Sequence, residues 1–179
     1  MSLVEPGPIA LRAVADAEAN VGVVEQGGEN HGKAVETYLR SVGLAAGAPW
    51  CAAFVHYRLR EAAREIQARL PGDFPVSGYC PDYQDWAKKH GVWIPVDTAR
   101  SMGSIPERGD LCLFYFAAKR RVAHIGMVAQ AGLGGALFQT VEGNTGPETG
   151  VNRDGDGVYK KSRSCASLGE FGGFIRLVF

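Results

Sequence analysis

The spacing of apolar residues changes once along the chain, near Pro95. Before this point apolar side chains recur every three or four residues, as in the segment 50–70, where Val55, Leu59 and Ala62 share one helical stripe. After it they alternate or form short runs between turn residues, which is typical of strands. Helices followed by strands predict an α+β domain in which N-terminal helices pack on one face of a C-terminal antiparallel sheet.

The individual elements follow from the same patterns and from the residues that end them. We expect helices at 10–21, 32–42, 50–70 and 81–90, and strands at 110–116, 122–128, 137–141, 158–161 and 174–179. No internal repeat, low-complexity tract or linker interrupts the chain, so a single domain over residues 1–179 is expected.

Composition excludes several classes of protein. Of the 179 residues, 46% are hydrophobic and 21% are charged, which indicates a globular chain and not a disordered one. Lys+Arg and Asp+Glu number 19 each, so the electrostatic attraction that dominates nucleic-acid and anionic-membrane binding is missing, apart from the short basic run 119–121. No stretch approaches the roughly 18 apolar residues of a membrane span, and the segment 1–6 lacks the pattern of a secretory signal. We therefore expect neither a nucleic-acid nor a membrane partner, and no export by the general secretory route.

Cysteine spacing argues against a metal centre. The four cysteines lie 29, 32 and 53 residues apart, without a C-x-x-C pair, and are expected to be free thiols (Cys51, Cys80, Cys112, Cys165). The segment 152–157 begins like a calcium loop, but its twelfth position is Arg163, where a bidentate glutamate is required. Neither a metal nor another cofactor is expected.

Cys51 stands at the expected start of the third helix, directly after Pro49 and Trp50. Unpaired backbone N–H groups and the positive end of the helix dipole favour a thiolate there, as a nucleophilic cysteine requires. The alternative is a small buried hydrophobic residue. The other three cysteines have no comparable reason to ionise.

A thiolate nucleophile needs a basic partner, and three of the four histidines are poor candidates. His56 lies on the same helix as Cys51 but about 140° around it, so the two side chains cannot meet. His90 precedes a helix-ending glycine, where a basic side chain is ordinary, and His31 lies in a polar turn.

His124 differs because it interrupts an apolar strand, two residues before Gly126, which leaves room for another group to approach. The next strand ends at Glu142, followed by Asn144, and Glu142 is our first candidate for the group that orients the His124 ring, with Asn144 as a second polar member. A satisfied core histidine and a solvated strand-end acid are the alternatives.

The chain resembles the CHAP family of cysteine amidases and peptidases, which is related to the NlpC/P60 and papain-like enzymes. The resemblance rests on collinear segments that cover nearly the whole chain: 30–39, Gly47-Ala48-Pro49-Trp50-Cys51-Ala52-Ala53-Phe54-Val55, Ile105-Pro106-Glu107-Arg108-Gly109-Asp110-Leu111, Ala123-His124-Ile125-Gly126-Met127-Val128, Val141-Glu142-Gly143-Asn144-Thr145 and 155–163.

This resemblance implies a papain-like fold, Cys51 as nucleophile, His124 as general base, and Glu142, with Asn144 nearby, as the orienting group. It further implies bacterial peptidoglycan as the substrate, cut at the amide between glycan and stem peptide or at a peptide bond. The chain departs from the family in two respects: it shows no separate wall-binding module, and Glu25–Glu29 does not reproduce the acidic loop of calcium-binding members. Of the aromatic residues that could line a substrate cleft, Trp50 is the candidate contact.

The sequence thus predicts a peptidoglycan hydrolase with a thioester intermediate. Two alternatives remain open: a non-catalytic module that binds cell-wall glycopeptide on the same fold, and a cysteine amidase that acts on another amide. Because no secretory signal is visible, we expect the protein to reach the wall by lysis, in a phage particle or by contact-dependent export, with a phage or secretion assembly as the corresponding partner.

Overall fold

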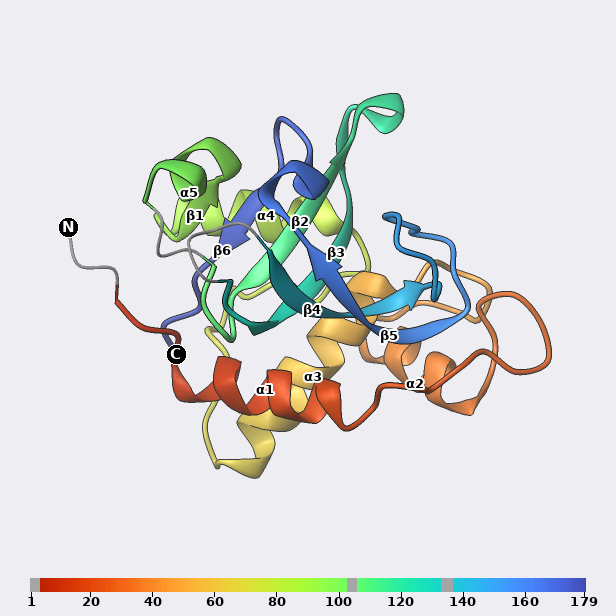
Figure 1. Cartoon of the computed structure of the whole chain (residues 1–179). Helices are drawn as coiled ribbons and strands as arrows, with labels where there is room; N and C mark the ends of the chain where they lie inside the picture. Colours follow the sequence, from red (N-terminus) through yellow and green to blue (C-terminus); the bar gives the residue numbers. More distant parts are fainter. Residues whose placement is uncertain (1–3, 103–105, 133–136) are drawn as a thin grey trace.

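The structure is a computed structural model that describes residues 4–102, 106–132 and 137–179. Two parts of the sequence-based expectations lie outside the described residues: residues 1–3 of the segment without a secretory signal, and Ile105 of the family segment 105–111. The elements, drawn in Figure 1, are α1 (Pro8–Glu18), α2 (Lys33–Ser41), α3 (Cys51–Glu65), α4 (Cys80–Lys89), β1 (Trp93–Pro95), α5 (Val96–Met102), β2 (Leu111–Phe116), η1 (Ala117–Lys119), β3 (Arg121–Gln130), β4 (Phe138–Thr145), β5 (Gly157–Arg163), η3 (Cys165–Leu168) and β6 (Gly173–Ile175).

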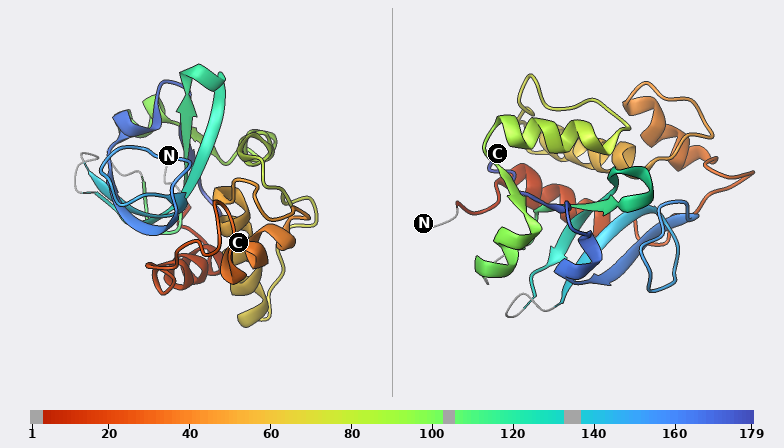
Figure 2. Two further views of the ribbon diagram at one scale, coloured as in Figure 1. Left: turned by 90° about the vertical axis from the view of Figure 1, so that its right-hand side faces the viewer. Right: turned by 90° about the horizontal axis from the view of Figure 1, so that it is seen from above.

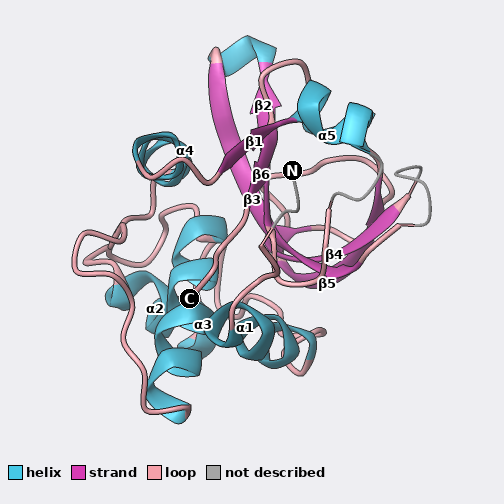
Figure 3. Ribbon diagram, turned by 90° about the vertical axis from the view of Figure 1, so that its left-hand side faces the viewer, coloured by secondary structure: helices cyan, strands magenta, loops and turns pink. Residues whose placement is uncertain are grey.

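The strands form one antiparallel sheet in the order β1-β6-β2-β3-β4-β5. This arrangement confirms the predicted α+β class with N-terminal helices and a C-terminal sheet. Figure 3 shows that the sheet is strongly curved, with α1, α2 and α3 together on one side of it. The last strand pair, β4 and β5, runs from Phe138 opposite Arg163 to Thr145 opposite Gly157.

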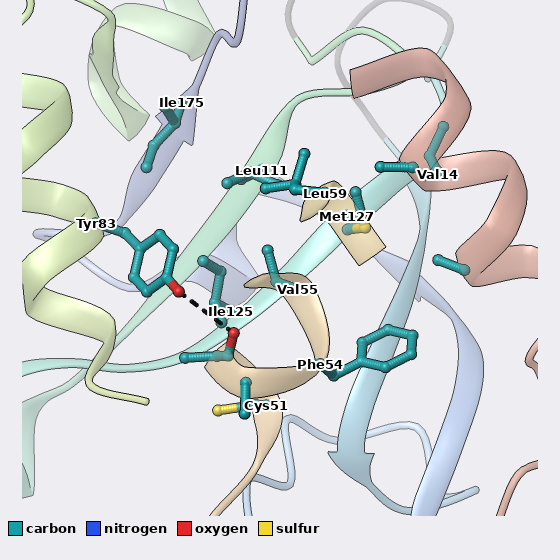
Figure 4. Packing of buried hydrophobic residues seen from close by; sticks show 14 of the residues in the cluster. Val14, Cys51, Phe54, Val55, Leu59, Tyr83, Leu111, Ile125, Met127 and Ile175 are labelled. Atoms are coloured by element: carbon teal, nitrogen blue, oxygen red, sulfur yellow. Dashed lines mark hydrogen bonds between the residues drawn. The ribbon is translucent and has the colours of Figure 1, made fainter. Parts of the chain in front are cut away.

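The main core lies between α1–α4 and one face of the sheet. Alternate residues of β2 and β3 point toward the helices, and Ile125 and Met127 pack near Val55 and Leu59 of α3 (Figure 4). Each fully buried aliphatic side chain contributes about 1.5–3 kcal/mol relative to an exposed one. This packing fixes α3, and with it Cys51, against β3.

A second apolar cluster covers the opposite face of the sheet, which corrects the expectation of helices on one face only. The cluster is formed by β1, β2, β3, β4 and β6 together with the short helices α5 and η3 (Ile94, Val96, Ala99, Cys112, Phe114, Val128, Phe138, Cys165, Leu168, Phe174). Neither α5 nor β1 was expected, because segments of seven and three residues are too short to show a period. Figure 2 shows α5 on a different side of the molecule from α1–α3.

The expected helix 50–70 and the expected strand 174–179 are clearly shorter in the structure. Helix α3 ends at Glu65 because Gln67 takes a left-handed conformation (φ 55°), although the apolar stripe continues to Leu70. The last strand ends at Ile175, because Arg176 donates its N–H to the Val92 carbonyl and the following residue pairs with the N-terminal segment through Gly7. The segments 7–9 and 177–179 therefore lie side by side.

Among the described residues, no helix combines the length and the apolar character needed to cross a membrane.

Candidate active site

Cys51 is the first residue of α3, as the sequence predicted. Its side chain is only 3% exposed, and Figure 4 shows its sulfur at the margin of the packed core. The N–H of Cys51 has no acceptor within its own helix because it belongs to the first turn. The sulfur and an unpaired amide thus occupy the same helix end.

His124 and Glu142 lie where β3 and β4 separate. The paired residues of these strands stop at Met127 opposite Val141, so His124 and Glu142 lie beyond the last pair. Both are completely buried, and His124 Nε2 is 2.9 Å from Glu142 Oε2. Gly126 makes room for this contact, because a Cβ atom there would come within 2.6 Å of Glu142 Cγ.

Glu142 is held by residues that the sequence analysis did not identify. Arg163 donates from Nε to Oε1 and from Nη2 to Oε2, both at 2.8 Å, and the Thr140 hydroxyl donates to Oε1 at 2.6 Å. Arg163 also donates to the carbonyls of Thr149 and Gly150. Paired, bidentate geometry of this kind is what makes a buried carboxylate tolerable.

These contacts leave one ring nitrogen of His124 for Cys51. Nε2 is engaged by Glu142, while Nδ1 is buried without a hydrogen-bond partner among the described residues. Burial alone would lower the pKa of His124, but its interactions with Cys51 and Glu142 raise it to about 9. Burial would likewise raise the pKa of Glu142, but Arg163 and His124 lower it to about 2.

The Cys51 thiol shifts in the direction that a nucleophile needs. Hydrogen bonding with Cys80 lowers the pKa of Cys51 well below its ordinary value, and His124 and the Ile125 amide act in the same sense, while burial opposes them. A Cys51 thiolate and a His124 imidazolium would add one negative and one positive charge to the Glu142 carboxylate and the Arg163 guanidinium. The four buried charges then sum to zero.

Cys80 is a further residue near the site that was not among the candidates, because its position in the sequence offered no reason to ionise. It opens α4, and its sulfur lies 3.8 Å from that of Cys51. The hydrogen bond with Cys51 and burial raise the pKa of Cys80 well above its ordinary value, so Cys80 stays a thiol and can donate to a Cys51 thiolate. All four cysteines are free thiols in this structure.

Asn144 contacts the residue that precedes Cys51. Its Oδ1 accepts the Trp50 N–H at 2.8 Å, and its Nδ2 donates to Gly155 O at 2.9 Å and to Asn30 Oδ1 at 3.2 Å. Asn144 was expected to help orient His124, but among the described residues its side chain has no hydrogen bond to that ring. Asn144 instead fixes the residue that precedes Cys51.

Trp50 is completely buried, which corrects its assignment as a substrate contact. Its indole packs against Tyr38 and Phe54, and its Nε1–H donates to Glu25 Oε1 at 2.8 Å. Glu25 also accepts the Asn30 N–H through its other oxygen, at 2.8 Å. Glu25 therefore helps to hold the start of α3 in place. The sequence did not predict this role, because a single glutamate in a polar turn is ordinary.

A cleft of about 420 Å³ opens onto both sulfurs. Its lining combines apolar residues with two arginines (Val42, Leu44, Ala48, Pro49, Val76, Ser77, Gly78, Tyr79, Arg121, Ala123, Arg153). The Arg121 guanidinium lies over the Tyr79 ring, 4.8 Å from its centroid. A molecule bound in this cleft would lie next to Cys51, Arg121 and Arg153.

The remaining histidines are engaged elsewhere. His56 Nδ1 lies 3.0 Å from the Pro75 carbonyl, His90 Nε2 lies 2.8 Å from Asp73 Oδ2, and His31 Nδ1 lies 2.6 Å from the Glu29 carbonyl. The structure thus brings His124, and none of these three, to the Glu142 side of Cys51.

The residues of the calcium-like segment are also occupied. Asp156 Oδ1 accepts from the Tyr159 hydroxyl at 2.9 Å, and the Asp154 N–H donates to Asn152 Oδ1 at 2.9 Å. In the described ranges no three histidine, cysteine or acidic side chains gather into a potential metal site.

Comparisons with known proteins add only a distant likeness in fold. No family model matches the chain, and no curated protein matches it. One similar solved structure is described as "The crystal structure of Ly7917", with 13% identity and a TM-score of 0.49, and another as the same protein "with the hydrolyzing product of MDP", with 13% identity and a TM-score of 0.46. Each comparison covers 93% of this chain and 62% of the other, so the chain spans about three fifths of their length. A likeness of this size assigns neither a family nor an activity.

Proposed function

We propose that this protein is a cysteine hydrolase that cleaves amide bonds of bacterial peptidoglycan. The observation that carries the proposal is the convergence of Cys51, His124 and Glu142, from one helix and two strands, into a single buried arrangement. A helix-start thiol, an imidazole with one free nitrogen and an ionised carboxylate on its other nitrogen are the parts that thiolate catalysis uses.

In the proposed reaction the Cys51 thiolate attacks the carbonyl carbon of the scissile amide. The Cys51 N–H, unpaired at the start of α3, supports the negative charge that develops on the carbonyl oxygen. His124 donates its Nδ1 proton to the departing amine, which leaves a thioester on Cys51. His124 then takes a proton from water, and the resulting hydroxide hydrolyses the thioester.

Glu142 keeps its charge throughout this cycle. Because Arg163 and His124 hold its pKa at about 2, it accepts the Nε2–H of His124 in both protonation states of the ring and does not itself take the proton. Arg163 is a positioning residue, since it acts through Glu142 and not on the substrate.

The substrate class rests on the resemblance of the quoted segments to the CHAP family, and the cleft is compatible with it. Arg121 and Arg153 would meet a carboxylate of a peptide, and Val42, Leu44 and Val76 offer an apolar surface for its side chains. Stem peptides that carry free carboxylates suit these walls. The second solved structure named above is described with a hydrolysis product of MDP, which concerns that protein alone.

The test is digestion of purified peptidoglycan by the parent protein and by Cys51→Ala, with Cys165→Ala as the matched control. Cys165 is buried in the second apolar cluster, away from the cleft. We expect soluble fragments and new free amino groups, without new reducing sugar ends, from the parent and from Cys165→Ala, and none from Cys51→Ala. Retained activity in Cys51→Ala, or new reducing ends, would contradict the proposal, and binding of the wall without release of fragments would favour the non-catalytic module.

A further inference from the structure

Cys51 has a second thiol as its neighbour, and hydrolysis does not require one. Cys51 and Cys80 are 29 residues apart in the chain but open two helices whose first residues meet, with 3.8 Å between the sulfurs. Cys112 and Cys165 belong to the apolar cluster on the other face of the sheet. The structure thus pairs Cys51 with one particular cysteine.

Specific contacts hold the two helix starts together. The Tyr83 hydroxyl, on the first turns of α4, donates to the Ser77 carbonyl at 2.8 Å and reaches the Ala52 carbonyl of α3 at 3.5 Å (Figure 4). Tyr83 is completely buried. The approach of the sulfurs therefore belongs to the packing of α4 on α3 and not to a chance side-chain rotamer.

The pair is also accessible to a small reagent. Both cysteines line the cleft of about 420 Å³, although each is only 3% exposed. A disulfide needs the sulfurs about 2.05 Å apart, so they must approach by roughly 2 Å. A low-pKa cysteine next to a second thiol is the arrangement that redox-sensitive proteins use.

We propose that Cys80 is the resolving partner of Cys51, so that a hydroperoxide converts the pair into a reversible disulfide that blocks the nucleophile. The proposal shares the Cys51 sulfur with the proposed function but does not depend on the substrate. The disulfide would protect Cys51 from irreversible oxidation and keep the protein inactive until a thiol reductant opens it.

The reaction balances in two steps. First, the Cys51 thiolate attacks one peroxide oxygen, the S–O bond forms, the O–O bond breaks, and the departing hydroxide is protonated to water. Second, Cys80 loses its proton, its sulfur attacks the Cys51 sulfur, and the S–O bond breaks as the S–S bond forms, so that hydroxide leaves and takes up that proton. Two thiols are oxidised by two electrons in total, and one hydrogen peroxide is reduced to two waters.

The surroundings of Cys80 favour the second step only after the first. The raised pKa of Cys80 is due first to its hydrogen bond with Cys51 and then to burial, while Arg121 and Arg153 act in the opposite sense. A Cys51 sulfenic acid is neutral, so the repulsion from the Cys51 thiolate disappears and the two arginines remain. Cys80 is then easier to ionise than in the resting protein.

The experiment follows masses, so its result is independent of any activity. The protein is titrated with hydrogen peroxide from one molar equivalent to an excess, free thiols are blocked with iodoacetamide, and a tryptic digest is mapped without reduction. We expect a linked pair of peptides, 41–58 with 70–88, that separates after treatment with dithiothreitol. Cys51 as sulfinic or sulfonic acid beside an unmodified Cys80 in the parent protein would overturn the proposal.

Two variants sharpen the result. At the excess of hydrogen peroxide, which supplies the two equivalents that a sulfinic acid requires, we expect Cys51 of Cys80→Ser to accumulate as sulfinic acid, which dithiothreitol does not reverse. Cys165→Ser under the same conditions should give the same linked peptides as the parent. Full recovery of the Cys51 thiol in peroxide-treated Cys80→Ser would also overturn the proposal. A linked pair in a protein that fails to digest peptidoglycan would support the disulfide and contradict only the proposed function.

Discussion

At the scale of single residues, the site depends on how charge is shared between His124 and its two neighbours. Nε2 of the ring is bound to Glu142, and its interactions with Cys51 and Glu142 hold the pKa of His124 at about 9 against the effect of burial. The imidazolium therefore persists at pH values where an ordinary histidine is neutral. In the proposed reaction, this is the proton that passes to the leaving amine.

The pH dependence of Cys51 alkylation and of peptidoglycan hydrolysis should separate these effects. The lowered pKa of Cys51 predicts fast reaction with iodoacetamide well below pH 8.5, and this rate should stay high as the pH rises, because the thiolate is already formed. Hydrolysis should instead fall as the pH rises through about 9, because His124 then loses the proton that the leaving amine requires. The measurement is both rates across pH 5–10, in roughly half-unit steps.

Variants of His124 and Glu142 should move the two profiles differently. His124→Ala should shift the alkylation midpoint upward, toward about 8.5, and remove nearly all hydrolysis. Glu142→Gln should keep measurable hydrolysis, about 10²–10⁴-fold reduced, and bring its upper limb below pH 9, because the support for the imidazolium is lost. An unmoved alkylation profile in His124→Ala, together with a shifted one in His31→Ala, would place the base in the N-terminal turn.

The sequence pattern identified the candidate residues whose immediate neighbours in the chain mark them out. It missed the residues that reach the site only through tertiary contacts. Cys51 precedes an apolar stripe and His124 interrupts an apolar strand, and both features can be read within a few residues. Arg163 reaches Glu142 because β5 pairs with β4, and Cys80 reaches Cys51 because α4 packs beside α3. Those two depend on contacts across 21 and 29 residues, which no local pattern reveals.

At the scale of elements, the separation of β3 and β4 creates the space for the histidine and glutamate. Gly126 contributes to this space because it has no side chain, and the Glu142 side chain occupies the volume that a Cβ atom would take. We predict that Gly126→Ala displaces Glu142, costs about 1–3 kcal/mol of unfolding free energy and lowers hydrolysis toward the level of Glu142→Gln. Urea unfolding and the hydrolysis assay measure the two effects.

Gly72→Ala is the matched control for this substitution. A Cβ atom at Gly72 would meet nothing within 4 Å, whereas at Gly126 it would lie 2.6 Å from Glu142 Cγ and 3.3 Å from Cys112 Sγ. Gly72→Ala should unfold at the parent's urea concentration within error and hydrolyse at the parent's rate. Parent-like activity in Gly126→Ala would show that Glu142 needs no such space.

Most long elements could be predicted from the sequence, but their ends could not. The period of apolar residues in 50–70 predicted α3, while its end at Glu65 is set by the left-handed Gln67. The short α5 and η3 were missed for a different reason. Each buries two residues against the second face of the sheet, Val96 and Ala99 in α5 and Cys165 and Leu168 in η3. Their helical form depends on packing against that face.

At the scale of the whole molecule, a buried ion pair ties both chain ends to the sheet. Arg176 Nε donates to Asp110 Oδ1 at 2.6 Å and Nη2 to Oδ2 at 2.9 Å, while Nη1 donates to the Val4 carbonyl and to Glu107. Asp110 is completely buried. This arrangement joins the two termini to the start of β2.

Removal of one partner should cost far more than removal of both. Arg176→Met leaves a buried, unpaired carboxylate and should lower the free energy of unfolding by about 3–5 kcal/mol. The double variant Asp110→Asn/Arg176→Met should lose less, because no uncompensated charge remains, and Asn can still accept the Glu107 N–H through its side-chain oxygen. Urea denaturation of the three proteins gives the comparison, and equal losses for the single and double variants would contradict it.

The reacting groups are divided between the two layers of the fold. Cys51 belongs to the helices, His124 and Glu142 belong to the face of the sheet that those helices do not cover, and the sulfur and the ring meet only where β3 and β4 part. A small shift of α3 along the sheet would therefore separate the Cys51 sulfur from the His124 ring without breaking the pairing of any strand. If the proposed function holds, hydrolysis should be lost on gentle heating before the sheet unfolds, so that activity reports on the packing of the helices against the sheet.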